Sequence, residues 1–219
     1  MLSNRKPNAT KLSAENLIAR LNASQVNVGL RSNEDANPKN RAAQDQYAQA
    51  SNKNALTRAA VLVPIILRDD GLRVLLTKRT EHLKNHAGQI SFPGGRVDDT
   101  DRDVQHTALR ETEEEVGLHP SHVDIVGELD QYIVGTGYLV SPIIGIIKPP
   151  FKLIRQENEV AEIFEAPLDF LITPKNFTRY AREFNGKMHH HFAITWQNYF
   201  IWGATAGMLR NLSQRLLKA

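Results

Sequence analysis

The pattern of apolar and polar positions predicts a series of short strands in the middle of the chain. Residues 59–67 (AAVLVPIIL) give a strong strand signal, because apolar and β-branched residues dominate them. Asp70-Gly71 is a turn signal, and residues 72–78 (LRVLLTK) follow it, so we expect a hairpin. Further strands are expected at residues 90–92, 123–129 and 139–147.

Three other segments carry apolar residues at the spacing of a helix. Residues 12–21 are expected to form one helix, with Ser13 as a candidate N-cap. Residues 200–217 predict an amphipathic helix packed on the sheet. Its inward-facing residues are expected to be Ala204, Met208, Leu209, Leu212 and Leu216. The pattern therefore contains both helices and strands.

The third predicted helix, residues 104–116, has clear signals at both ends. Asp101 or Asp103 is a candidate cap at its start, and Gly117 stands where a left-handed residue would end it. Leu109, Thr112 and Val116 fall on one side of this helix.

Three carboxylates gather on one face of the same helix. Glu111, Glu114 and Glu115 lie within a sector of roughly 100°. Like charges one turn apart repel each other, and carboxylates in the last turn face the negative end of the helix dipole. A bound divalent cation would reverse both effects, and oxygen-rich sites suit Mg²⁺ or Mn²⁺. The alternative is a solvated acidic face without a ligand.

Composition and charge are those of an ordinary globular chain with an appendage. Of the 219 residues 41% are hydrophobic and 23% charged, and there is no cysteine, which excludes disulfides and thiol chemistry. No apolar run approaches the roughly 20 residues of a membrane span. We expect an N-terminal helix and linker over residues 1–55 and the main domain over residues 56–219.

The two parts differ in charge. Residues 1–55 contain eight Lys or Arg and four Asp or Glu, whereas the remainder contains 19 and 20. The main domain is therefore not a basic polyanion-binding domain, and we expect neither a nucleic-acid nor a membrane partner for it. A cytoplasmic location is expected; a mitochondrial transit peptide is the alternative, which Glu15 and the low Arg content disfavour.

The stretch from Gly94 to Leu118 resembles the Nudix box, G-x5-E-x7-R-E-U-x-E-E-x-G-U, in which U is a bulky apolar residue. The second half fits in register: Arg110, Glu111, Glu114, Glu115, Gly117 and Leu118 all match, with Thr112 at the first apolar position. The first half departs by one residue. One extra residue restores Gly95 and puts Asp101 where the family has a structural Glu, so the departure affects the loop and not the metal ligands.

A second signature lies just upstream. Residues 75–98, LLTKRTEHLKNHAGQISFPGGRVD, resemble the motif LLTxRSxxLRxHxGxVxFPGGxxD of the Nudix branch that hydrolyses coenzyme A. Thr80, Lys84 and Ile90 are conservative replacements in it. Together the resemblances cover roughly residues 58–210. They imply an α/β Nudix fold, in which a mixed β-sheet is sandwiched between helices (α/β/α).

The resemblance implies a coenzyme A diphosphatase that cuts its substrate into 3′,5′-ADP and 4′-phosphopantetheine with Mg²⁺ or Mn²⁺. The expected metal ligands are Glu111 and Glu115, with Glu114 as a third and the Gly95 carbonyl as a fourth. Arg110 is expected to orient a carboxylate through its planar guanidinium. The general base is open between these glutamates, Glu114 and Glu115 among them, and Glu162 in the segment 158–171, where Glu159 is a further candidate near the metals.

Candidate substrate contacts surround this helix in the sequence. They are Arg79, Lys84 and His86 for phosphates, Gly94 for close backbone approach to the diphosphate, and Tyr138 for stacking on adenine.

Two other functions stay open at this stage. One is a Nudix pyrophosphatase acting on ADP-ribose, NADH or a dinucleotide, and the other is a non-catalytic Nudix-like binding module. The presence of all three box glutamates disfavours the module. The sequence leaves undecided the form of coenzyme A that is cut, the preferred metal, the oligomeric state (a homodimer included) and the role of residues 1–55.

Overall fold

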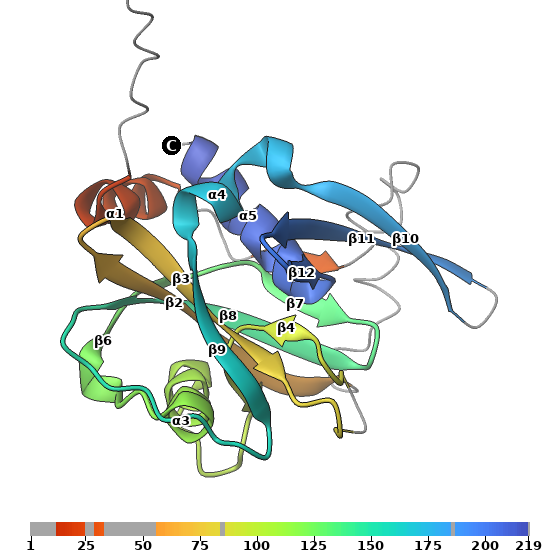
Figure 1. The fold of residues 1–219 in the computed structure, drawn as a ribbon, viewed down its shortest axis with the longest axis horizontal. Helices are drawn as coiled ribbons and strands as arrows, with labels where there is room; N and C mark the ends of the chain where they lie inside the picture. Colours follow the sequence, from red (N-terminus) through yellow and green to blue (C-terminus); the bar gives the residue numbers. More distant parts are fainter. Residues whose placement is uncertain (1–11, 25–28, 33–55, 84–85, 185–186, 219) are drawn as a thin grey trace, which may run out of the picture.

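A long antiparallel hairpin forms the centre of the fold. In the computed structural model, which describes residues 12–24, 29–32, 56–83, 86–184 and 187–218, β2 (Thr57–Arg68) turns into β3 (Gly71–Arg79). Ile65 pairs with Val74 across this hairpin, as the apolar pattern and the Asp70-Gly71 turn predict. Nearly every residue in the middle of β2 is buried, so the hairpin is the core of the molecule (Figure 1).

The hairpin belongs to a mixed sheet of nine strands. Along its main path the order is β1 (Leu30–Ser32), β7 (Gln131–Val134), β8 (Tyr138–Ile147), β2, β3 and β4 (Ile90–Ser91). β8 runs parallel to β2 and pairs with it from Thr57–Tyr138 to Ile66–Ile147. Three further strands join at the sides: β5 (Gly94–Arg96) pairs with β2, β6 (Val123–Glu128) with β8, and β9 (Val160–Pro167) with β3.

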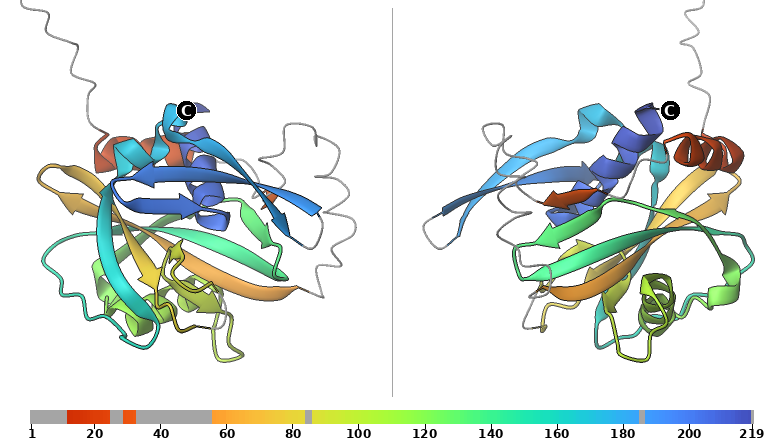
Figure 2. Two further views of the ribbon diagram at one scale, coloured as in Figure 1. Left: turned by 45° about the vertical axis from the view of Figure 1, so that its right-hand side comes forward. Right: turned by 180° about the vertical axis from the view of Figure 1, so that it is seen from behind.

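Helices cover both faces of this sheet, so the expected α/β/α arrangement is confirmed. Among the described residues, α3 (Val104–Val116) is the helix on one face, where it packs against β2 and β5. The opposite face carries α1 (Ala14–Ala23), α4 (Leu168–Ile172) and α5 (Ala204–Lys218). Figure 2 shows α3 on one side of the sheet and these three helices on the other. Two short 3-10 turns, Pro120–His122 and Pro174–Asn176, complete the connections.

A second sheet of three strands is a departure from the predicted pattern. β10 (Thr178–Phe184), β11 (Lys187–Trp196) and β12 (Tyr199–Trp202) form it in that order. Residues 200–202 are therefore a strand, and the C-terminal helix starts at Ala204 and not at 200. Its predicted inward face is correct, since Met208, Leu209, Leu212 and Leu216 are buried. β7 is also absent from the predicted strands; it is only four residues long, QYIV, and lies in the interval between two longer predicted strands.

The first helix and β1 pack into the same core as the rest of the described chain. Leu17 and Leu21 of α1 are buried beside α5. Asp130 accepts hydrogen bonds from Gly29 N at 3.0 Å, Arg31 Nε at 2.6 Å and Asn211 Nδ2 at 2.9 Å. These contacts fasten β1 to β7 and α5. Within the described residues, no helix is long and apolar enough to cross a membrane.

The contact between α5 and β7 yields the first prediction. A Cβ on Gly207 would lie 2.3 Å from the hydroxyl oxygen of Tyr132, a ring that is 2% exposed and cannot move aside. We expect Gly207→Ala to lower the free energy of unfolding by about 1–3 kcal/mol, because this overlap outweighs the ~1 kcal/mol gain in helix propensity. Urea denaturation measures the change.

Gly135→Ala is the matched control. A Cβ there meets nothing within 4 Å, so its free energy of unfolding should stay within about 0.5 kcal/mol of the parent. An equally stable Gly207→Ala protein would show that α5 can shift away from Tyr132.

Candidate active site

Two glycines bring the backbone of residues 93–95 close to β2 and α3. Gly94 has φ +151°, and a Cβ on it would lie 2.4 Å from the Ala60 carbonyl oxygen. A Cβ on Gly95 would lie 2.3 Å from Glu111 Oε2. Position 94 therefore requires glycine, and at Gly95 a side chain would displace the Glu111 carboxylate, which lies directly against this backbone.

Helix α3 begins and ends where its sequence signals predict. The Asp103 carboxylate accepts a hydrogen bond from His106 N at 2.7 Å, so Asp103 is the N-cap, and Gly117 is left-handed with φ +69°. Buried Ala108 and Val116 hold the helix against the sheet. This places Glu111 and Glu115, one turn apart, beside the glycine pair.

Asp101 takes a structural role in the loop before α3. Its side chain is inaccessible to solvent and accepts hydrogen bonds from Asp98 N at 2.9 Å and Thr107 Oγ1 at 2.8 Å. Arg110 adds a bidentate pair, with Nε at 3.0 Å and Nη2 at 2.9 Å from the two carboxylate oxygens. The Arg110 guanidinium holds the pKa of Asp101 far below its usual range. The geometry agrees with the alignment that puts Asp101 at the position of the family's structural Glu.

Arg110 also contacts two of the box glutamates. Its Nη1 donates to Glu111 Oε1 at 2.9 Å and to Glu114 Oε1 at 3.2 Å. The Glu114 side chain is 58% exposed and points to Arg110, whereas that of Glu111 is largely covered. Arg110 thus orients carboxylates, as the sequence predicts, and it holds Glu114 at the surface.

Glu115 is the most perturbed group of the site. Its side chain is 7% exposed, and Oε2 has no hydrogen-bond partner among the residues that the structure describes. The pKa of Glu115 is raised to about 8, chiefly by burial; the charges of nearby Glu159 and Glu111 contribute to the rise, and Arg79 opposes it. Arg79 Nη1 lies 3.7 Å from Oε1. Burial likewise raises the pKa of Glu111, against the effect of Arg110.

This chemistry fits a divalent cation. A buried carboxylate with a free oxygen, a second carboxylate one turn away and an adjacent glycine backbone are oxygen donors of the kind that Mg²⁺ and Mn²⁺ bind. In the described part of the chain, no group of three or more His, Asp or Glu side chains is already arranged as a metal cluster. The fit therefore rests on Glu111, Glu115 and the backbone at Gly95.

The structure distinguishes the two acidic candidates, Glu159 in the turn before β9 and Glu162 in β9. Glu159 lies near enough to Glu115 and Glu111 to raise the pKa of both. Glu162 instead accepts a hydrogen bond from the Tyr199 hydroxyl at 2.5 Å. Glu162 shares a strand face with Phe164, and the rings of Phe164 and Tyr199 stack with their centroids 3.8 Å apart. Ile163, which points to the opposite face of β9, packs toward α3. The geometry favours Glu159 over Glu162 as the acid beside the box.

The remaining predicted contacts are spread over several elements. Arg79, at the end of β3, reaches Glu115. His86 has a left-handed backbone with φ +59°, and its Nδ1 lies 2.8 Å from Gln89 Oε1. Tyr138 is opposite Thr57, whereas Gly94 is opposite Val61 on the other side of β2. The two residues are therefore offset by about 13 Å along β2 and lie on different neighbouring strands. Lys84 lies outside the described residues.

One element of the site has no signal in the sequence. The segment before β9 lies against the end of α3, where Ile154 N donates to the Val116 carbonyl at 2.8 Å and Gln156 N to the Glu115 carbonyl at 2.9 Å. These bonds satisfy carbonyl groups that a helix end otherwise leaves open.

The chain is similar to several known proteins. The model of the NUDIX domain matches residues 56–185. A protein of Escherichia fergusonii named "Uncharacterized Nudix hydrolase NudL" is 43% identical over 160 residues, which cover 73% of this chain and 82% of the relative. A protein of Shigella boydii with the same name is 44% identical over the same shares. A crystal structure of a C. elegans Ap4A hydrolase binary complex is 21% identical with a TM-score of 0.43, over 51% of this chain and 80% of that one.

The Asp101 network predicts a strong dependence of stability on one carboxylate. We expect Asp101→Asn to lower the free energy of unfolding by about 3 kcal/mol at pH 7, because Arg110 would lose a buried partner. The depressed pKa makes the contribution of Asp101 complete above pH ~4 and lost as the pH falls further. The difference between the two proteins should therefore shrink in acid. The exposed neighbour gives a control, Asp99→Asn, for which urea denaturation should show no loss.

The raised pKa of Glu115 predicts that its contribution to stability changes with pH in the opposite direction. In metal-free protein the unfolded chain releases the Glu115 proton near pH 4.5, whereas the folded chain keeps it until about pH 8. Stability from this group therefore falls as the pH rises between these values. We expect Glu115→Gln to be more stable than the parent by on the order of 4 kcal/mol at pH 8 and equally stable at pH 4. Equal stability of the two proteins at pH 8 would contradict the burial of a charged Glu115.

Proposed function

This chain belongs to the Nudix hydrolase family, and we propose that it hydrolyses the diphosphate bond of coenzyme A or its derivatives with Mg²⁺ or Mn²⁺. The observation that supports the chemistry most directly is the buried Glu115 carboxylate, which has one free oxygen and lies beside Glu111 and the glycine pair. Oε2 is buried without a hydrogen-bond partner among the described residues, and Arg79 contacts only the other oxygen, so a bound cation would stabilise this carboxylate.

Each box residue has a distinct task in this proposal. Glu111 and Glu115 hold the metal, with the Gly95 carbonyl as a further oxygen ligand. When bound, such an ion neutralises the oxygens of a diphosphate and lowers the pKa of a bound water. Arg110 keeps Glu111 in place and ties Glu114 to the loop. Glu159 is our candidate for the base that takes the proton of the attacking water, because its charge acts on both Glu111 and Glu115 from outside α3.

Residues upstream of the box support the choice of substrate. The stretch from Leu75 to Asp98 resembles the coenzyme A motif and supplies both Arg79, which reaches Glu115, and the glycine pair. His86 of this stretch has a left-handed backbone conformation and lies in the turn between β3 and β4. The same stretch therefore provides parts of the site and the specificity signature, with Arg79 and His86 as phosphate contacts.

The test is product analysis on a panel of substrates. Coenzyme A, ADP-ribose and NADH are incubated with Mg²⁺ or Mn²⁺, and the products are identified by mass. We expect coenzyme A to give 3′,5′-ADP and 4′-phosphopantetheine. Cleavage of ADP-ribose or NADH alone would retain the Nudix chemistry and reject the substrate; cleavage of none would favour a binding module.

A matched pair of variants tests the metal ligands. Glu115→Gln should fold and lose about three orders of magnitude in kcat/KM, which corresponds to ~4 kcal/mol of transition-state stabilisation. Glu113→Gln, an exposed glutamate of the same helix, should keep the activity of the parent. Near-normal turnover of Glu115→Gln would reject the assignment of the metal site.

A further inference from the structure

β10 is an open edge strand. It ends the three-stranded sheet, and within the described residues no strand pairs with its outer side. Its seven residues pair with β11 without a bulge, from Thr178–Ala193 to Phe184–Lys187, and they include neither proline nor glycine. A bulge or a proline on an edge strand blocks pairing with another chain, and β10 has neither. Its charged residues are of both signs, so a second copy of the same strand can place opposite charges beside them.

Two arginines, Arg179 of β10 and Arg210 of α5, form an arginine cluster on one face of this sheet. Arg179 of β10 pairs in register with Phe192, and the Arg210 guanidinium of α5 stands 5.5 Å from the centre of the Phe192 ring and 5.3 Å from that of Phe177. Arg210 Nε is buried without a hydrogen-bond partner in the described part of the chain. Burial and the charges of Arg179 and Arg31 lower the pKa of Arg210.

No carboxylate of the described residues neutralises Arg179 or Arg210. Arg31 is different, because its Nε lies 2.6 Å from Asp130. Two cations that repel each other beside apolar rings are an unfavourable arrangement, and an added carboxylate would relieve it.

We propose that two copies of this chain associate through their β10 strands, antiparallel about Ala181, so that Glu183 of the second copy pairs with Arg179. Residues directly opposite in an antiparallel pair point to the same face of the sheet. Glu183 of the second copy therefore arrives on the face of Arg179 and Phe192, toward Arg210. The two-fold axis repeats the contact, so each copy donates one carboxylate and receives one.

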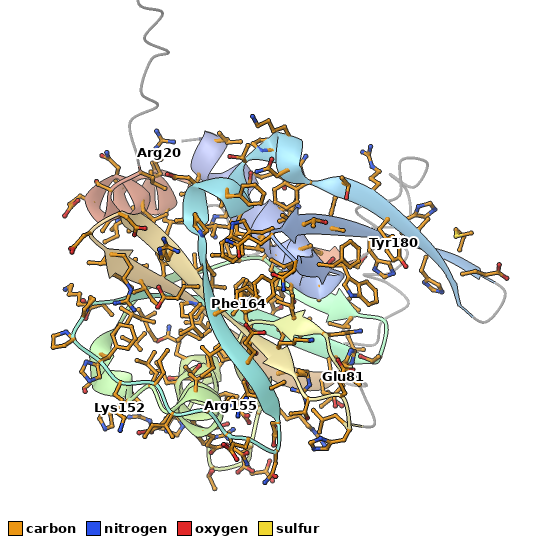
Figure 3. The ribbon with its side chains drawn as sticks, in the orientation of Figure 1. Arg20, Glu81, Lys152, Arg155, Phe164 and Tyr180 are labelled. Atoms are coloured by element: carbon orange, nitrogen blue, oxygen red, sulfur yellow. The ribbon has the colours of Figure 1, made fainter. Side chains whose placement is uncertain are left out.

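The charges of β10 select this register. Pairing about Tyr180 would instead put Arg179 opposite Ala181 of the second copy and leave the cluster without an acid. Exposed apolar side chains lie on the same sheet: Tyr180, Met188 and Phe200 are 37%, 55% and 43% exposed. Figure 3 shows Tyr180 on the projecting part of β10 and β11, away from α3. Joining the two edges gives one six-stranded sheet.

Disulfide trapping tests the pairing directly, because the chain has no cysteine of its own. In the proposed register Ala181 lies opposite itself, about 4.5–5.5 Å apart between Cα atoms, which a disulfide can span. We expect Ala181→Cys to form a covalent dimer on mild oxidation. Met188→Cys is the control, since it is exposed on β11, at least about 14 Å from its counterpart. Equal cross-linking of both variants, or none of Ala181→Cys, would overturn the proposal.

Charge reversal tests the register by sedimentation of the full chain. Arg179→Glu or Glu183→Arg should each weaken the dimer by about tenfold, because both symmetric pairs become repulsive. The double variant restores opposite charges and should recover the dimer. A monomeric parent at high micromolar concentration, or single variants that dimerise like the parent, would refute the pairing. Far-UV circular dichroism confirms that each variant is folded.

Discussion

The site depends on the ion pair between Arg110 and Asp101. One guanidinium binds the solvent-inaccessible carboxylate through two hydrogen bonds and still donates to Glu111, Glu114 and the Arg96 carbonyl. Because Asp101 also binds Asp98 N and Thr107, this pair fixes the loop to the first turn of α3. It also decides which acids Arg110 binds: Glu114 is paired with it at the surface, whereas Glu115 is not and has only Arg79, at 3.7 Å, beside it.

The charges of α3 are unfavourable for an isolated helix. Its last turn is acidic and contains no basic residue, although the dipole there favours cations. Gly117 and the N–H groups of Ile154 and Gln156 bind the final carbonyls, and buried Ala108 and Val116 provide the packing. These contacts hold Glu115 buried beside two other acids, where its charge is unfavourable. Local instability at a site that the surroundings enforce is typical of a binding position awaiting its ligand.

Short-range signals in the sequence predict much of this. The Asp103 cap, the Gly117 end and the β2–β3 turn each depend on neighbouring residues, and counting back from Arg110 finds Asp101. Glu159 and Glu162 could not be separated in this way, because the side to which each points depends on where β9 begins and on the irregular pairing near Lys78 and Arg79. The three-stranded sheet was missed for a similar reason: its polar, histidine-rich strands carry little apolar alternation, and packing on α5 stabilises them.

The proposed active site and the proposed dimer interface lie on different sides of the molecule. α3 and its carboxylates lie on one side of the main sheet, and β10 projects from the other, as all three views show (Figures 1 and 2). Pairing through β10 would therefore leave the carboxylate pair open to a substrate. The two sides are nevertheless connected through β4: Thr205 at the start of α5 donates to the Ile90 carbonyl, and β12 packs against β4. Since β4 leads directly into Gly94 and Gly95, ordering of the second sheet would steady the backbone that faces Glu111.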